Sequence, residues 1–254
     1  MAVFAIADLH LPAQQKPMDI FGDHWKDHAQ RIFDDWRGRV ASGDAVLLPG
    51  DLTWAMKLEE ALEDLMAIGA LPGEKVLLRG NHDYWWNSIG RVRRALPEGM
   101  YALQNDSVAL GGRLYAGSRG WVLPVPETDA ADLRIYQRER LRLEMSLQHA
   151  RHVGGDAPIT AMMHYPPLTE DEPGFSDLLE RYCVTDCVYG HLHGPAIFHG
   201  PCAWRRPRRT WRASRRCPAR SCCFGATMTI GGRPSAASEG CWATGCMTFR
   251  TTVY

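Results

Sequence analysis

Carboxylate, imidazole and amide side chains follow five separate apolar runs of this 254-residue sequence. In chain order, the motifs are D-L-H (8–10), G-D (50–51), G-N-H-D (80–83), H-Y-P-P (164–167) and G-H-L-H (190–193). A single polar residue after a buried strand is ordinary, because strand ends and helix caps are commonly polar. Five such motifs in succession favour one shared site over five unrelated strand ends.

The side-chain types in these motifs favour divalent metal ions. Mixed His, Asp and Asn donors without a thiolate suit Mn, Fe, Zn or Co rather than a structural cysteine zinc site. The predicted ligands are Asp8, His10, Asp51, Asn81, His164, His191 and His193. They are too many for one ion and suit two ions that share a carboxylate. Two ions about 3.5–4 Å apart can activate water and hold both oxygens of a phosphoryl transfer.

The apolar runs that precede the motifs predict strands buried on both faces. These runs are residues 3–8, 45–51, 75–81, 159–165 and 184–191. Apolar residues at three- and four-residue steps predict helices over 25–40, 58–68, 86–96 and 133–150. Apolar and polar residues alternate over 100–121, with glycine-rich breaks between the alternating stretches, which predicts two antiparallel strands. The whole pattern predicts an α/β fold with the motifs at the carboxyl ends of its strands, where open α/β sheets place ligand sites.

These motifs, in this order, resemble those of the calcineurin-like metallophosphoesterase superfamily. The stretches K-P-M-D-I-F-G, L-L-P-G-D, L-L-R-G-N-H-D-Y-W-W and M-M-H-Y-P-P are similar to those of small bacterial members of unassigned substrate. The resemblance covers about residues 1–200. It implies a four-layer α/β/β/α sandwich, in which two facing sheets lie between helices.

The resemblance also implies a ligand set for each of two metal ions, for which Mn is the first expectation. The first ion would be held by Asp8, His10 and His193. The second ion would be held by Asn81, His164 and His191. Asp51 would bridge the two ions.

The implied reaction is hydrolysis of a phosphomonoester or phosphodiester by in-line attack of a metal-bridging hydroxide. His82 would act as general acid or transition-state stabiliser, oriented by Asp83. Arg119 is a candidate substrate-binding residue, because a guanidinium suits phosphate oxygens, and Asn81 is a second candidate. A solvated or ion-paired arginine is the alternative for Arg119.

The sequence changes character after about residue 200. Residues 1–193 hold 19 Lys and Arg against 28 Asp and Glu, whereas residues 194–254 hold ten Arg, no Lys and one acid. We therefore expect a metallophosphoesterase domain over 1–200 and an atypical Arg- and Cys-rich tail over 201–254. The tail is interpreted as a nucleic-acid-binding arm, a zinc site or an out-of-frame translation. The last is favoured, and the C-terminal strands of the fold would then be missing or disordered.

The remaining expectations concern location, partners and the other histidines. The N-terminus lacks a basic region before its apolar run, and no stretch approaches the roughly 18 apolar residues of a membrane span. We therefore expect a cytoplasmic protein that acts on a small phosphoester and not on a membrane. The alternative is a catalytically impaired interaction or nucleic-acid-binding protein on the same fold. His28 lies on a predicted helix and is expected at the surface.

Overall fold

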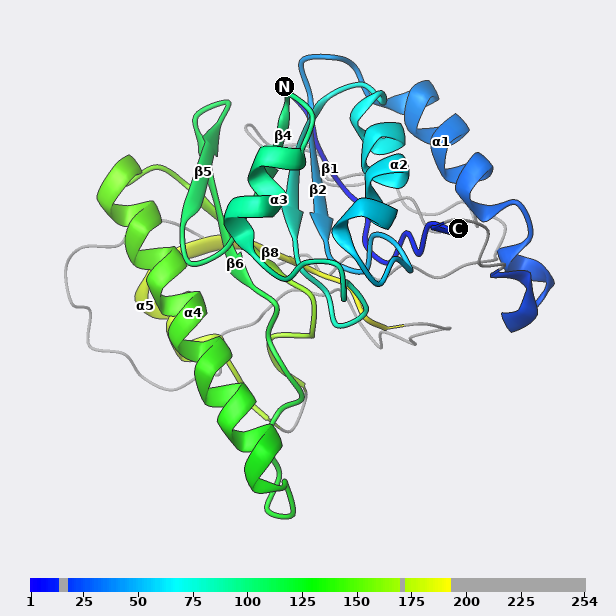
Figure 1. The fold of residues 1–254 in the computed structure, drawn as a ribbon. Helices are drawn as coiled ribbons and strands as arrows, with labels where there is room; N and C mark the ends of the chain where they lie inside the picture. Colours follow the sequence, from blue (N-terminus) through cyan, green and yellow to red (C-terminus); the bar gives the residue numbers. More distant parts are fainter. Residues whose placement is uncertain (14–17, 170–171, 193–254) are drawn as a thin grey trace, which may run out of the picture.

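The computed structural model describes residues 1–13, 18–169 and 172–192. Within these residues the chain forms two sheets of four strands each. Figure 1 shows the two sheets, with α1 and α2 beside the first sheet and α4 and α5 beside the second.

The first sheet is parallel and has the strand order β1-β2-β3-β4. Its strands are β1 (Val3–Ala5), β2 (Ala45–Pro49), β3 (Glu74–Leu78) and β4 (Met100–Ala102). The helices that pack on its outer face are α1 (His28–Arg39), α2 (Leu58–Gly69) and α3 (Ile89–Ala95). The short helices η1 (Asp19–Phe21) and η2 (Asp23–Trp25) precede α1. The apolar faces of α1 and α2 bury side chains such as Trp36 and Leu65 against the sheet, as amphipathic helices do.

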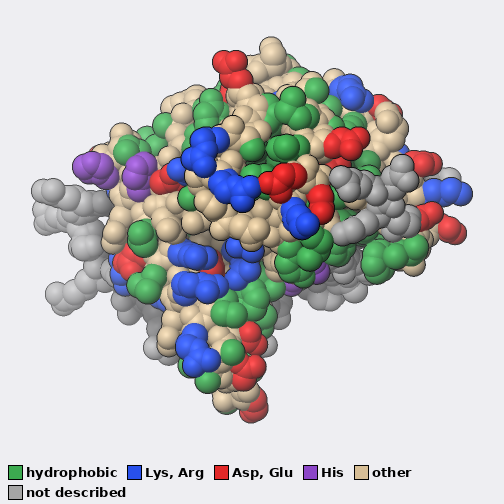
Figure 2. Space-filling view, viewed as in Figure 1, with side chains coloured by type: hydrophobic (Ala, Val, Ile, Leu, Met, Phe, Trp, Pro, Cys, Tyr) green, Lys and Arg blue, Asp and Glu red, His purple; other side chains and the backbone are tan. Residues whose placement is uncertain are grey.

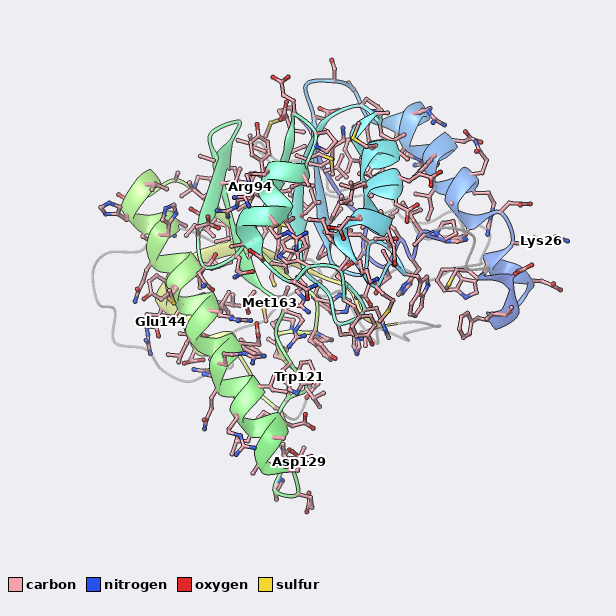
Figure 3. All side chains as sticks on the ribbon, viewed as in Figure 1. Lys26, Arg94, Trp121, Asp129, Glu144 and Met163 are labelled. Atoms are coloured by element: carbon pink, nitrogen blue, oxygen red, sulfur yellow. The ribbon has the colours of Figure 1, made fainter. Side chains whose placement is uncertain are left out.

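The second sheet has the strand order β5-β6-β7-β8. Strands β5 (Ser107–Leu110) and β6 (Arg113–Ser118) are antiparallel, while β7 (Ile159–Met163) and β8 (Val184–Tyr189) run parallel to β6. Helices α4 (Ala130–Gly154) and α5 (Ser176–Arg181) cover its outer face. Asp129 caps α4 by accepting hydrogen bonds of 2.8 Å from the N–H groups of Ala131 and Asp132, and it lies at the lower end of that helix in Figure 3.

A third apolar core lies between the two sheets. It joins side chains of both sheets, among them Leu47, Val76, Tyr115, Met162 and Val188, all of which are buried. Strand residues therefore face apolar neighbours on both sides, which explains the continuous apolar runs in the sequence. The four-layer α/β/β/α fold is confirmed, and each of the five predicted strands is present.

The prediction for residues 100–121 is only partly right. It expects two antiparallel strands, but β4 is parallel to β3 and completes the first sheet, while β5 and β6 form the hairpin. Helix α3 forms the crossover that brings Met100 and Ala102 into the first core. Trp86 is buried as its periodicity predicts, but α3 begins only at Ile89.

The predicted tail over 201–254 lies outside the described residues, so its structure stays a prediction. Among the described residues, β8 is an edge strand of the second sheet. No helix among them is both long enough and apolar enough to cross a membrane.

Candidate metal centre

The loops that leave five strands meet at one edge of the sandwich. The Asp8 N–H donates to the Gly50 carbonyl at 3.0 Å, and the His10 N–H donates to the Asp51 carbonyl at 3.0 Å. The Gly190 N–H donates to the carbonyl of His164 at 3.1 Å, which links the loops of the second sheet. These bonds hold the predicted motifs side by side.

The backbone is left-handed at several predicted ligands. The φ angles are 56° at Asp8, 42° at His10, 55° at Asp51 and 73° at His191. Residues with a Cβ rarely adopt this region, and such conformations cluster at functional sites. The strand ends therefore turn sharply, immediately where the predicted ligands stand.

Glycines make room for the ligand side chains. A Cβ on Gly80 would overlap Asp51 Oδ1 and lie 2.8 Å from Asp51 Cγ, and a Cβ on Gly50 would lie 2.7 Å from His164 Nδ1. A Cβ on Gly190 would lie 2.6 Å from Asp8 Oδ2. The space that a larger residue would occupy is thus filled by predicted ligands.

Asp51 lies at the middle of the cluster and is completely buried. Its Oδ1 accepts from the His82 N–H at 2.8 Å. Its Oδ2 lies 3.4 Å from His164 Nε2 and 3.9 Å from His10 Nε2, and has no hydrogen-bond donor within the described residues. Burial raises the pKa of Asp51, but the attraction of His164 and His10 and the His82 N–H outweigh it and lower the pKa to about 2. Asp51 is therefore an ionised carboxylate with one oxygen aimed at two imidazoles.

His164 presents a lone pair to the same space. Its Nδ1 lies 3.0 Å from the Pro49 carbonyl, which can only accept, so this nitrogen carries the proton. In the neutral ring Nε2 is then an acceptor, and it faces Asn81 Oδ1 at 2.6 Å as well as Asp51. Burial lowers the pKa of His164, but Asp51 and Asp8 raise it by a larger amount, so the net shift is upward. A divalent cation between these acceptors would satisfy all of them.

The ligand atoms that Asp8, Asp51 and His164 offer lie within 4.8 Å of one another. Carboxylate oxygens and an imidazole nitrogen suit a borderline divalent ion. These residues therefore fit a metal ion. Such an ion would accept electron pairs from the buried Asp51 Oδ2 and from Nε2 of His164.

His191 extends the cluster on its β8 side. Its N–H donates to Asp8 Oδ2 at 2.9 Å, and its Nδ1 lies 3.0 Å from Asn81 Oδ1. The ring packs on Tyr165, with 4.0 Å between centroids. His193, the last predicted ligand, lies outside the described residues. The other six predicted ligands are brought together.

A sequence model of the family described as calcineurin-like phosphoesterase matches residues 1–195. The chain belongs to this family. It is therefore a metal-dependent hydrolase of ester bonds to phosphate. No curated protein matches the chain.

Solved structures resemble this phosphoesterase at low sequence identity. One is a protein of unknown function, AQ665 from Aquifex aeolicus, with 17% identity, a TM-score of 0.43 and 89% of each chain covered. Another is the phosphopantetheinyl hydrolase PptH from Mycobacterium tuberculosis, with 15% identity and a TM-score of 0.47. That match covers 90% of this chain and 89% of the other.

His82 lies at the rim of the phosphoesterase's metal centre among aromatic rings. Its ring centroid is 4.8 Å from that of Trp54 and 6.0 Å from that of Tyr84. Trp54 also stacks on His10 with centroids 4.9 Å apart. The His82 Nδ1 is buried and has no hydrogen-bond partner within the described residues. The ring is thus held by packing, with its backbone fixed to Asp51.

Asp83 has a different role from the predicted one. Its Oδ2 accepts from the N–H groups of Asp51 (2.9 Å) and Gly80 (2.7 Å), and its Oδ1 accepts from the Leu52 N–H (2.9 Å) and the Trp85 Nε1–H (3.0 Å). None of these four bonds goes to His82, because Asp83 points inward and is completely buried. Burial, with the charge of Asp51, raises the pKa of Asp83 to about 6. Asp83 ties the loops after β2 and β3 together and so positions Asp51.

Arg119 lies beside the centre but points toward α4. Its carbonyl accepts from the His164 N–H at 3.0 Å and the Tyr165 N–H at 2.9 Å. Its guanidinium lies 4.5 Å from the Trp121 ring and 3.8 Å from Glu139 Oε1. Burial lowers the pKa of Arg119, against the charge of Glu139. The backbone of Arg119 supports the metal centre, and its side chain lines a neighbouring pocket.

Sequence reasoning misses His28, and the expectation that it lies at the surface is wrong. Its side chain is buried, with Nδ1 3.0 Å from the Trp25 carbonyl and Nε2 3.1 Å from the carbonyls of both Leu9 and His10. It therefore supports the loop that carries Asp8 and His10. The missed signal is spacing, because His28 lies four residues before Ile32 and so falls on the apolar stripe of α1.

Proposed function

We propose that this phosphoesterase hydrolyses a small phosphomonoester or phosphodiester with two divalent metal ions, Mn before Fe, Zn or Co. The observation that carries the proposal is the position of Asp51. One buried carboxylate oxygen lies 3.4 Å from His164 Nε2 and 3.9 Å from His10 Nε2, between the two predicted ligand sets. A carboxylate so placed suits a bridging ligand.

The proposed ligands fall into two groups around that carboxylate. Asp8 and His10, with His193, would hold one ion, and Asn81, His164 and His191 would hold the other. When bound, the ions supply positive charge to the phosphoryl oxygens and lower the pKa of a water that attacks phosphorus in line. The chain holds the proposed bridging ligand in a buried position before the ions bind. The His82 N–H donates to the Asp51 carboxylate, and the Asp51 N–H donates to the Asp83 carboxylate.

His82 is the proposed general acid for the leaving oxygen. It is held by Trp54 and Tyr84 at the rim, and its backbone N–H is bonded to the proposed bridging carboxylate. This attachment fixes the backbone of His82 relative to the proposed metal ligands, and a general acid must be held in position beside the substrate. The Asp83 carboxylate supports this arrangement indirectly, as a positioning residue.

The test of the proposal is turnover of aryl phosphates and of a bis-aryl phosphate diester by the full chain with Mn. Asp51→Asn should reduce turnover of both ester classes to background, and Asp34→Asn, at an exposed position on α1, should retain it. Unchanged turnover in Asp51→Asn would refute the proposal. The mono- and diester arms show which class is the better substrate.

The role of His82 is tested by leaving-group dependence. His82→Gln should lower kcat by about 10²–10⁴-fold for phenyl phosphate, and by much less for dinitrophenyl phosphate, whose leaving oxygen needs no proton. His152→Gln, at an exposed position on α4, is the matched control. An equal loss for both leaving groups would contradict a general acid at His82.

A further inference from the structure

A polar pocket lies between α4 and the ends of β3 and β6. It encloses about 260 Å³. Its charged lining residues are Arg79, Arg119, Arg138, Arg142 and Glu139. Figure 2 shows Lys and Arg side chains gathered on the face beside α4, below α3, with an acidic side chain among them. The pocket is therefore basic, unlike the metal centre.

The single carboxylate does not neutralise the described lining of this pocket. Glu139 is almost completely buried, and its Oε1 lies 2.8 Å from Arg142 Nη1, 3.4 Å from Arg138 Nε and 3.8 Å from Arg119 Nη2. One acid thus serves several guanidinium groups, and the charged lining residues carry a net positive charge. Glu139 offsets only one of the four positive charges, so a further anion in the pocket would reduce the repulsion among the rest.

Two guanidinium Nε–H donors of lining residues lack an acceptor in the part of the chain that the structure describes. The Nε atoms of Arg79 and Arg119 are buried and have no hydrogen-bond partner within the described residues. A buried donor without an acceptor is costly, and the planar guanidinium fork matches the oxygens of a phosphate. The amides of Gln104 and Asn105 add neutral hydrogen-bonding groups to the wall. The lining therefore suits a multiply charged oxyanion.

Hydrogen bonds join the walls of the pocket. The Ser118 hydroxyl donates to the Glu139 carbonyl at 3.1 Å, and the Gly117 N–H donates to Ser146 Oγ at 2.8 Å. These bonds fasten α4 to the end of β6. A preformed site loses little conformational freedom when its ligand binds.

The end of β3 contributes to both sites, and the loop after β6 is bonded to the loop after β7. Arg79 directly precedes Gly80 and Asn81 in the sequence. Arg119 accepts the backbone bond from His164, and Trp121, labelled in Figure 3, lies under its guanidinium. A molecule bound at one site therefore lies close to the other.

We propose that this four-arginine pocket binds a phosphate-type anion, and that this anion is a second phosphate of the substrate whose ester is cleaved at the metal centre. The substrate class would then be bis-phosphorylated compounds. The claim that the pocket binds a phosphate-type anion depends on the pocket alone. The claim that this anion belongs to the substrate rests on the proposed function. The shared chemistry also fits free inorganic phosphate, and the two arms of the test separate these sources.

The first arm measures binding without turnover. Inorganic phosphate is titrated by calorimetry into the full chain after metal removal with a chelator. Arg138→Gln with Arg142→Gln should weaken binding at least about tenfold, because two charge-assisted contacts are lost. Arg134→Gln, at an exposed position of the same helix, should change nothing.

The Glu139→Gln variant should bind phosphate more tightly than the wild type, and loss of folding could only weaken binding. Removing the competing carboxylate should tighten phosphate binding by about tenfold. Absence of phosphate binding in the wild type would overturn the proposal. Equal binding in the wild type and the double arginine variant would overturn it as well.

The second arm measures turnover of a matched pair with Mn, the monophosphate and the bisphosphate of butane-1,4-diol. The bisphosphate should have at least about tenfold higher kcat/KM, and the ratio should fall toward one in the double arginine variant. Phosphate binding without this preference would assign the pocket to free phosphate and overturn the substrate part. If the wild type hydrolyses neither ester nor any aryl phosphate, the proposed function and the substrate part fail, whereas the binding arm still decides the pocket.

Discussion

Replacement of Gly80 by alanine tests how the centre is built. The added methyl carbon would overlap Asp51 Oδ1 and lie 2.8 Å from Asp51 Cγ. Carbon atoms pack at about 3.5–4.0 Å, so the carboxylate must move by about 1 Å. Gly80 has no left-handed φ, so the added methyl group acts through contact and not through backbone strain.

The size of the effect follows from that displacement. Asp51 Oδ2 lies 3.4 Å from His164 Nε2, and a shift of about 1 Å would remove it from the shared ligand position. A misplacement of this size at a reacting centre lowers turnover by about 100-fold. The overpacked loop should also lower the free energy of unfolding by about 1–3 kcal/mol.

The assay compares Gly80→Ala with Gly43→Ala in aryl phosphate turnover, Mn affinity and urea denaturation. A Cβ on Gly43 meets nothing within 4 Å, so that variant should match the wild type in all three. Wild-type turnover and Mn affinity in Gly80→Ala would refute the reasoning, because Asp51 would then tolerate the displacement.

Further predictions concern the supports of the centre and the N-terminal strand. His28→Ala should lower the free energy of unfolding in urea by about 1–3 kcal/mol, because the carbonyl of His10 loses a buried donor. Trp54→Leu should lower kcat for aryl phosphates more than it raises KM, since the ring holds His10 and His82 in place. Backbone N–H groups lower the pKa of Asp44 in the folded state, so its stabilisation is present above the unfolded pKa and is lost as the pH falls through the folded pKa. Asp44→Asn should therefore lose less stability than the wild type between about pH 5 and pH 3, measured as the shift in urea midpoint.

The positions of the candidate ligands among the described residues could be predicted because each follows a strand. Residues such as Asp51 and His164 mark the point where an apolar run ends, and the chemistry of the side chains is visible at that point. The four layers were predictable from the family resemblance and from runs that are apolar on both faces. The ligand positions depend on the local sequence, and the four layers depend on the order of the motifs along the chain.

The supporting contacts could not be predicted, because they join residues that are distant in the sequence. Asp83 bonds to the backbone of Asp51, and the direction of its side chain depends on how the loops after β2 and β3 meet. The prediction for Asp83 followed its neighbour His82 in the sequence and therefore missed this contact. The pairing of β4 is unpredictable for a similar reason, since a short strand joins whichever sheet its crossover reaches.

The sequence singles out Arg119 as a candidate phosphate-binding residue, but it does not predict the rest of the four-arginine pocket. In the sequence, Arg138 and Arg142 have the spacing of a solvated helix face. They form an anion-binding pocket only because β3 and β6 place two further arginines beside them. Periodicity identifies which side of α4 is apolar but not what lies opposite its polar side.

The measurement that tests the central claim most directly is calorimetric titration of Mn into the metal-stripped full chain, with elemental analysis of the product. The wild-type chain should bind two ions and Asp51→Asn should lose ion binding, with Gly43→Ala as the control. Stoichiometric binding that survives intact in Asp51→Asn, or no binding in the wild type, would contradict it.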